Sequence, residues 1–191
     1  MAKKTIKGRK KKWIEIIAPK MFNNAVIGEV PVYETETVMG KTATVNLMTL
    51  TNDMKKQNYN VSFEVNEIVG EKAHTRLIKY EILSSLLKRM VRRGKEKVDL
   101  SFKATTKDGQ TVLLKPLIIT RRKTSKPVLS SILQDAEKRI KLYANKINYD
   151  ALAQDIIFGG LGKKIKIPLC KIYPVRSVDV RVMKLMGKGN A

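Results

Sequence analysis

The alternation of apolar and polar residues predicts strands along most of the chain. Over residues 58–69, Val61, Phe63 and Val65 alternate with polar neighbours, which is the period of a strand with one buried face. Comparable patterns predict further strands at 13–17, 26–33, 42–50, 72–79, 98–106, 110–122, 164–173 and 175–185. Within the second of these, Pro31 cannot donate a ladder hydrogen bond and therefore favours an edge position or a bulge.

Three segments have helical spacing instead. Residues 81–93 place Leu83, Leu86, Leu87 and Met90 on one face, and a glycine follows the last turn. The other two helices are expected at 128–147 and 149–158. Because no regular crossover helix separates the strands, the pattern indicates an α+β fold with a mostly antiparallel sheet and flanking helices, rather than a doubly wound sheet.

Composition sets the size of the core. The chain has 191 residues, of which 43% are hydrophobic, so a single domain with a substantial core is expected. We expect this domain at 13–185, a basic disordered tail at 1–12 and a flexible tail at 186–191. Trp13 is expected to be buried in the domain and so to give the first tail a fixed starting point.

Charge changes this picture most. The chain carries 39 Lys and Arg against 17 Asp and Glu, a formal net charge of +22. A soluble domain normally has a net charge of about 2–8 in magnitude, so this excess needs an abundant polyanion to compensate it. Residues 1–12 contain seven of the cations and no acid, residues 13–87 are nearly neutral, and residues 88–191 are strongly basic.

Few residues are suited to catalysis or metal binding. Cys170 and His74 are the only residues of their types, so the sequence has neither an internal disulfide nor a Cys/His zinc motif. Cys170 is expected to be a buried thiol in a strand of a protein from a reducing cytoplasm, and His74 an ordinary surface or packing residue. The acids match no metal-loop pattern. We therefore expect no enzyme, no cofactor and no metal.

Two glycine-containing motifs resemble parts of phosphate-binding sites. Gly40-Lys41-Thr42 copies the end of a P-loop, but Thr35 stands where the motif needs glycine and a strand pattern follows it, so we interpret it as a chance match. The run 159–163 lacks the required Ser or Thr. It is interpreted either as the end of a helix or as a backbone nest for one RNA phosphate.

The cations form four groups, at 3–12, 88–97, 121–126 and spread over 163–188. Only 11 aromatic residues are present and no RNA-recognition or KH motif occurs, so we expect phosphate and shape contacts with folded RNA. The candidate contacts are Lys10, Lys11, Lys12, Arg89, Arg92, Arg93, Arg121, Arg122, Lys163, Lys164, Arg176 and Arg181. Some of them are expected to pair with acids instead. The alternatives are a free-standing regulator or chromatin-type DNA binder, for which the basic helix 81–93 could be misread as a recognition helix, and an RNA-modifying or phosphoryl-transfer enzyme.

Several segments carry a family resemblance. The stretch KKWIEIIAPKMFNNAVIGEV, residues 11–30, resembles the start of the archaeal and eukaryotic-type small-subunit ribosomal protein S-one, also called the S-three-Ae family. Four later segments follow in the family's order: LMTLTND (47–53), TTKDG (105–109), LGKKI (161–165) and KIYPVRSVDVRVMKL (171–185). The resemblance spans about residues 9–187, and the shortness of both ends favours an archaeal member.

The resemblance implies a fold and a function. Family members have a central β-barrel-like sheet with flanking helices, and they are not enzymes. They are structural components of the small ribosomal subunit, on its platform near the mRNA exit and the 3′ end of the rRNA. The implied partners are small-subunit rRNA and neighbouring ribosomal proteins, with mRNA or initiation factors as further candidates. The implied location is the cytoplasm, with no membrane contact.

Overall fold

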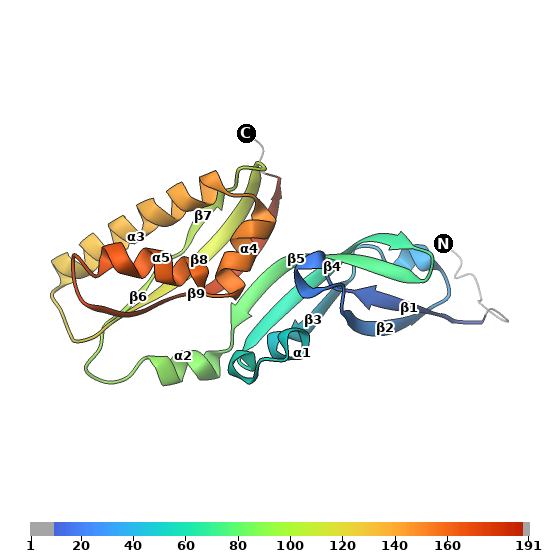
Figure 1. Cartoon of the computed structure of the whole chain (residues 1–191), viewed down its shortest axis with the longest axis horizontal. Helices are drawn as coiled ribbons and strands as arrows, with labels where there is room; N and C mark the ends of the chain where they lie inside the picture. The colour runs from blue at the N-terminus through green and yellow to red at the C-terminus, as the bar shows by residue number, and fades with distance from the viewer. Residues whose placement is uncertain (1–9, 189–191) are drawn as a thin grey trace, which may run out of the picture. The chain divides into compact units, whose positions relative to one another are not determined.

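The computed structural model describes residues 10–188 and divides into two compact units (Figure 1). The first unit comprises the described residues up to Gln57 together with Val61–Ile78, and the second comprises Asn58–Asn60 with the described residues from Lys79 onward. The two predicted tails lie largely outside the described residues, so the boundaries at 12 and 185 stay predictions.

One sheet of nine strands connects the elements, in the order β2-β1-β5-β9-β8-β6, with β3 and β4 joined through β5 and β7 paired to β8. The pairs β1–β2, β5–β9, β6–β8, β7–β8 and β8–β9 are antiparallel, and β1–β5 is parallel. The predicted α+β class, with a mostly antiparallel sheet and flanking helices, is confirmed.

The first unit is built from strands with short helical turns between them. Its elements are β1 (Lys12–Ile17), η1 (Lys20–Phe22), β2 (Val26–Val32), η2 (Thr35–Val38), β3 (Thr42–Asn46), α1 (Leu47–Thr51), η3 (Met54–Lys56), most of β4 (Tyr59–Val69) and most of β5 (Lys72–Ile82). Ile14, Val32, Val38, Val65 and Ala73 form a buried cluster in this unit. Strand β2 lies at the end of the sheet order, which confirms the edge position predicted from its proline.

The predicted strand at 42–50 is wrong in its second half. Strand β3 ends at Asn46, whose side chain accepts a hydrogen bond from the Met48 N–H at 2.9 Å and so caps helix α1. Asparagine is among the preferred N-cap residues because its oxygen satisfies an N–H that the first helical turn leaves free. The prediction extended the strand past Asn46 because the β-branched residues before it favour a strand.

The prediction that Trp13 is buried is also wrong, because its side chain is 60% exposed. Side chains alternate between the two faces of a strand. In β1 the inward positions belong to Ile14 and Ile16, which are 0% and 7% exposed, so Trp13 points outward. The start of the chain is therefore anchored by Ile14 rather than by the tryptophan.

The second unit is a curved antiparallel sheet covered by helices. Its elements are the end of β5, α2 (Ser84–Met90), β6 (Lys97–Asp99), β7 (Phe102–Thr105), β8 (Gln110–Thr120), α3 (Lys126–Lys146), α4 (Tyr149–Ile157), α5 (Gly160–Leu169) and β9 (Val175–Lys188). Strand β8 is central, because it pairs with β9 along its whole length and with β6 and β7 on its other side (Figure 1).

The two faces of this sheet are covered differently. Phe102, Leu114 and Met183 are opposite one another across β7, β8 and β9, and all three are buried. Helix α3 lies on this face, since the Lys141 ammonium is 5.6 Å from the centre of the Phe102 ring. The opposite face includes Leu117, which lines a pocket together with residues of α2. Helix α2 and helix α3 therefore lie on opposite faces.

Helix α2 is much shorter than the predicted helix at 81–93. Strand β5 continues through Ile82, where Tyr80 and Ile82 are buried in alternation and Tyr80 is opposite Met183 of β9. The helix then runs for seven residues and contains no fully buried side chain. Sheet pairing outweighed the helical spacing of the leucines, so Arg92 and Arg93 lie after the helix rather than in its last turn.

The predicted strand at 164–173 is a helix. Leu161, Ile165 and Leu169 recur every four residues along α5 and are all buried, which is the spacing of a helix face. The prediction of a strand was based instead on the short alternation of apolar and polar residues in the same segment. Cys170 follows this helix and is exposed, so the prediction of a buried strand thiol is wrong. Its thiol donates to the Val175 carbonyl oxygen, with the two atoms 3.8 Å apart.

The glycine run 159–163 has a structural role. Gly159 has φ +73°, the left-handed conformation that ends α4 and begins α5. A Cβ atom on Gly162 would be 2.2 Å from the Val178 carbonyl oxygen, so only glycine allows α5 to approach β9 this closely. The helix-ending interpretation accounts for this geometry without a phosphate.

The burial pattern of β1 generates a stability prediction. Ile14→Ala is expected to lower the free energy of unfolding by about 2–5 kcal/mol, because it leaves a cavity in the first unit's core. Trp13→Ala is expected to change it by no more than about 0.5 kcal/mol, because the side chain is exposed. Urea unfolding followed by circular dichroism measures both values. Equal losses for the two variants would contradict the assigned orientation of β1.

Candidate nucleic-acid interface

All twelve cations predicted to bind RNA are exposed. Lys10, Lys11 and Lys12 belong to the first unit. The other nine belong to the second unit: Arg89, Arg92, Arg93, Arg121, Arg122, Lys163, Lys164, Arg176 and Arg181. Exposure leaves their charged groups able to contact a ligand, but it does not test whether they bind RNA. Their role in binding therefore stays a prediction.

Within residues 10–187, Lys164 is the one of these twelve that forms an ion pair. Its ammonium lies 3.1 Å from the Asp155 carboxylate and also donates to the Tyr143 hydroxyl, which in turn donates to Asp155. Lys11 makes a different contact, with its ammonium 5.5 Å from the centre of the Tyr33 ring. The remaining positive charges are uncompensated by the carboxylates of the described chain, which is the state expected of a surface that meets an external anion.

Thr120 holds two of the predicted basic groups together. Its side chain is fully buried at the end of β8. The hydroxyl accepts from the Glu96 N–H at 2.9 Å and donates to the Arg122 carbonyl oxygen at 2.7 Å. It therefore fixes the backbone that follows Arg92 and Arg93 beside the backbone that carries Arg121 and Arg122. Because the buried hydroxyl forms hydrogen bonds with backbone groups of both segments, it orders these segments without the use of a charged side chain.

A third basic segment meets the same end of β8. Thr120 is opposite Val175 in the β8–β9 register, and the Arg121 N–H donates to the Pro174 carbonyl oxygen at 3.1 Å. The Tyr173 hydroxyl donates to the Lys123 carbonyl oxygen, also at 3.1 Å. Arg176 follows directly. We call this set the basic cluster, comprising Arg92, Arg93, Arg121, Arg122 and Arg176.

The sequence did not reveal this grouping. The cations of the basic cluster come from three segments that are up to 84 positions apart in the numbering, and the hydrogen bonds of Thr120 and Arg121 together with the β8–β9 register join the backbone of these segments. Thr120 was not among the candidates, although a hydroxyl at the end of the apolar run 117–119 and directly before two arginines is a usable signal. Lys163 and Lys164 lie on α5 and are not part of the cluster.

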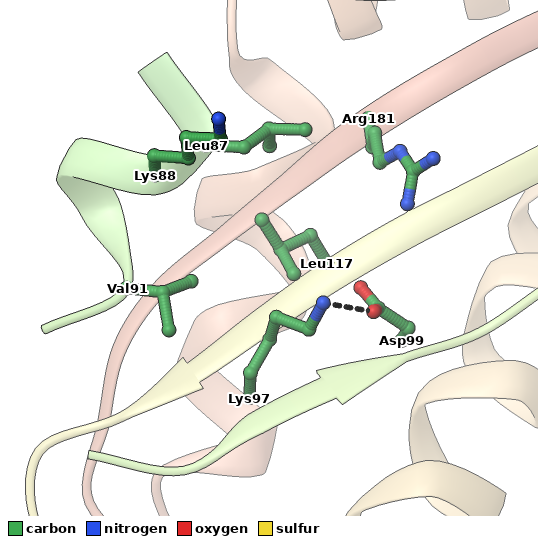
Figure 2. A pocket seen from close by; sticks show the side chains of 7 residues that line it. All are labelled: Leu87, Lys88, Val91, Lys97, Asp99, Leu117 and Arg181. Atoms are coloured by element: carbon green, nitrogen blue, oxygen red, sulfur yellow. Dashed lines mark ion pairs between the residues drawn. The ribbon is translucent and has the colours of Figure 1, made fainter. Parts of the chain in front are cut away.

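A pocket of about 260 Å³ opens beside helix α2, within the second unit (Figure 2). Leu87 and Val91 contribute its α2 side and Leu117 of β8 its floor. The charged residues around it are Lys88, Lys97, Asp99 and Arg181. Lys97 and Asp99 form an ion pair of 2.5 Å between Nζ and Oδ2, which the figure marks by a dashed line.

The hydrogen bonds around Lys164 alter three pKa values. Burial raises the pKa of Tyr143, and the hydrogen bond to Asp155 raises it further. The pKa of Asp155 is lowered overall, because the hydrogen bonds from Tyr143 and Lys164 outweigh a desolvation that would raise it. The hydrogen bonds to Tyr143 and Asp155 raise the pKa of Lys164. Lys164 therefore keeps its positive charge, but this charge is paired with the Asp155 carboxylate.

Asp179 is the acid placed most unfavourably for a negative charge. It lies on β9 opposite Leu117, and desolvation by burial raises its pKa above the usual 3.8, against a hydrogen bond from Ser177 and the charge of Lys166. Tyr59 and Tyr80 are stacked with ring centres 5.9 Å apart, and burial raises the pKa of both, with a smaller contribution from Asp179.

In the described part of the chain, no group of three or more His, Cys, Asp or Glu side chains is placed to hold a metal ion. None of the helices in that part is long and apolar enough to cross a membrane. His74 is exposed on β5.

The raised pKa of Asp179 predicts a pH-dependent effect of Asp179→Asn. Asparagine avoids the ionisation of a desolvated carboxyl, so the variant is expected to be more stable than the wild type at pH 7. A raised native pKa destabilises the wild type progressively as pH rises above 3.8, and below 3.8 this difference disappears. Urea unfolding of both proteins between pH 3 and pH 8 measures it. A variant that is less stable than the wild type at pH 7 would contradict the assignment.

Comparison with known proteins agrees with the sequence resemblance. A protein named "Small ribosomal subunit protein eS1" from Saccharolobus islandicus (strain L.S.2.15 / Lassen #1) is 30% identical over 180 residues, which cover 94% of this chain and 86% of that protein. The proteins of the same name from Saccharolobus solfataricus and Haloarcula marismortui are each 28% identical, over 94% and 93% of this chain and 86% and 84% of their own lengths. These relatives are archaeal, as the resemblance implied. The model of the Ribosomal S3Ae family matches residues 2–189, and the chain belongs to that family.

Proposed function

We propose that this protein is a structural constituent of the small ribosomal subunit and binds its rRNA through phosphate and shape contacts. The observation that carries the proposal is the exposed basic cluster of the second unit (Arg92, Arg93, Arg121, Arg122 and Arg176), whose arginines form no ion pair with a carboxylate within residues 10–187. The archaeal relatives are named as small ribosomal subunit proteins, which supports the same assignment.

Phosphate contact follows from the chemistry of the basic cluster. Arginine presents a planar fork of donors that matches two phosphate oxygens, and it stays charged at any physiological pH. Thr120 and the β8–β9 register order the backbone on which these arginines are carried. Less backbone entropy is therefore lost when RNA binds. The cluster spans three chain segments, so it suits a folded RNA surface better than one extended strand.

The location within the subunit is part of the proposal. The family resemblance favours the platform, near the mRNA exit and the rRNA 3′ end, with neighbouring ribosomal proteins as further partners. Lys10, Lys11 and Lys12 would extend the contact from the first unit, together with the cations of residues 3–9. Such a protein supports translation in the cytoplasm as a binding component and not as an enzyme. Contacts with mRNA or initiation factors are further candidates at this position.

Reading of duplex DNA by a recognition helix is not supported. Helix α2 has seven residues and lies against the sheet. Two of its side chains, Leu87 and Lys88, line a pocket. A helix that reads the major groove must instead present a full face to base edges. The long helix α3 pairs Arg139 with Asp135 and Lys141 with Glu137, so its exposed cations are partly neutralised.

The proposal predicts how charge removal affects subunit assembly. Arg92→Gln, Arg93→Gln, Arg121→Gln and Arg122→Gln together are expected to reduce incorporation into small subunits severalfold, because four uncompensated charges are lost without any buried contact. The measurement is sucrose-gradient sedimentation of a tagged protein expressed in archaeal cells.

A matched control removes paired charges instead. Arg139→Gln, Lys141→Gln, Asp135→Asn and Glu137→Gln remove two ion pairs from α3 and are expected to leave incorporation unchanged. The proposal fails if the wild-type protein sediments free of small subunits. It also fails if the two sets of substitutions reduce incorporation equally.

A further inference from the structure

The pocket beside α2 has a composition that the phosphate-binding function does not explain. Its lining is largely apolar, and Leu87, Val91 and Leu117 contribute to it. Phosphate contacts need neither a cavity nor aliphatic side chains. The half-buried α2 helix leaves this space open instead of closing it with a fully buried residue. The second unit therefore has room at this point for an apolar group from outside the chain.

The volume limits what can enter. At about 260 Å³, the pocket is smaller than the roughly 300–1,000 Å³ typical of sites for drug-sized ligands and cofactors. A single flat ring system or one side chain suits such a space. Aliphatic side chains on two sides of a slot form apolar surfaces against which a base can stack when it leaves its helix.

The charges at the rim indicate what the entering group is attached to. Lys88, Lys97 and Arg181 outnumber Asp99, which is the only acid that lines the pocket. Within residues 10–187, neither Lys88 nor Arg181 forms an ion pair. An apolar interior beside unpaired cations complements a heterocycle that is joined to a phosphate backbone. A purely apolar side chain of a protein would leave these charges without partners.

Asp99 adds a preference for one base. Its Oδ2 atom is paired with Lys97, and Oδ1 of the same carboxylate is a second acceptor. Figure 2 shows the Asp99 carboxylate and the Arg181 guanidinium on the side of the pocket away from α2. An ionised carboxylate only accepts hydrogen bonds. Guanine presents two adjacent donors, N1–H and the 2-amino group, whereas each other base places an acceptor beside its donor.

From these features we propose that the α2 pocket binds one unpaired guanine of RNA. The base inserts between α2 and β8, Asp99 accepts from its N1–H and 2-amino group, and Lys88 and Arg181 contact the adjoining phosphates. This inference deepens the proposed function and rests on it. It predicts a base-specific contact within an interface that is otherwise held by phosphate and shape.

The test uses the full chain and four RNA heptamers: UUUGUUU, UUUAUUU, UUUUUUU, and UUUIUUU with inosine at the centre. At one fixed salt concentration, UUUGUUU is expected to bind at least about fivefold more tightly than UUUUUUU, the lower end of discrimination by a bidentate base contact. Inosine lacks the 2-amino group and is expected to bind with intermediate affinity. The methyl NMR signals of Leu87 and Val91 are expected to shift on binding of UUUGUUU.

Two variants and a matched control test the pocket itself. Leu87→Trp fills the cavity and is expected to abolish the guanine preference. Leu142→Trp makes the same change on α3, where the leucine is 61% exposed, and is expected to preserve it. Asp99→Asn introduces a donor beside the guanine donors and is expected to abolish the preference without filling the pocket. Asp99→Asn keeps the test decisive if Leu87→Trp fails to fold.

The outcomes separate this inference from the proposed function. Equal affinity for all four heptamers, with no shift of the Leu87 and Val91 signals, overturns the guanine pocket. If the protein still binds small-subunit rRNA, the proposed function stands. Failure of the wild-type protein to bind any RNA overturns both. Shifts of the pocket signals with an acidic, leucine-containing peptide, but not with UUUGUUU, also overturn the proposal, because they assign the pocket to a protein partner.

Discussion

The pairing of β8 with β9 is the interaction on which the basic surface depends. Its register runs from Gln110 opposite Lys188 to Thr120 opposite Val175 and includes three irregularities. Strand β8 is buried on both faces over residues 117–120, so the ladder is held by the core as well as by backbone hydrogen bonds. A register shift of one residue would exchange the two faces of β9 and move every cation on that strand.

The same ladder connects the core to the charges at its ends. At one end, the buried Thr120 hydroxyl orders the segments of the basic cluster. On the face opposite α3, Leu117 forms the floor of the α2 pocket and Arg181 of β9 contributes to its rim. The glycine at 162 lets α5 pack closely on β9. The apolar residues of the core therefore decide where the cations lie.

Much of the fold could be predicted from local patterns. The alternation in 58–69, the edge proline and the helices near 128–147 and 149–158 all correspond to observed elements. The errors occurred where two patterns overlapped. The leucines after Tyr80 have helical spacing, but pairing with β9 extends β5 as far as Ile82. In α5, a four-residue period of buried residues was hidden beside a short alternation.

The candidate site was predictable only in part. Exposure of the twelve cations follows from the high cost of burying a charge, so the sequence was sufficient for it. Their grouping into one cluster depends on long-range register, which no local pattern encodes. The exposure of Trp13 was mispredicted because an aromatic residue was assumed to be the anchor, although Ile14 and Ile16 already occupy the inward positions of β1. Thr120 was missed because its role depends on Glu96, which is distant in the chain.

The central claim is that this surface is completed by the phosphates of rRNA, and the salt dependence of binding tests it most directly. Affinity of the full chain for small-subunit rRNA should be measured between 50 and 200 mM salt. If about 6–10 phosphates are neutralised, log K falls linearly with log[salt] and affinity drops by about 10³–10⁵ over this range. An affinity that hardly changes with salt would contradict the account.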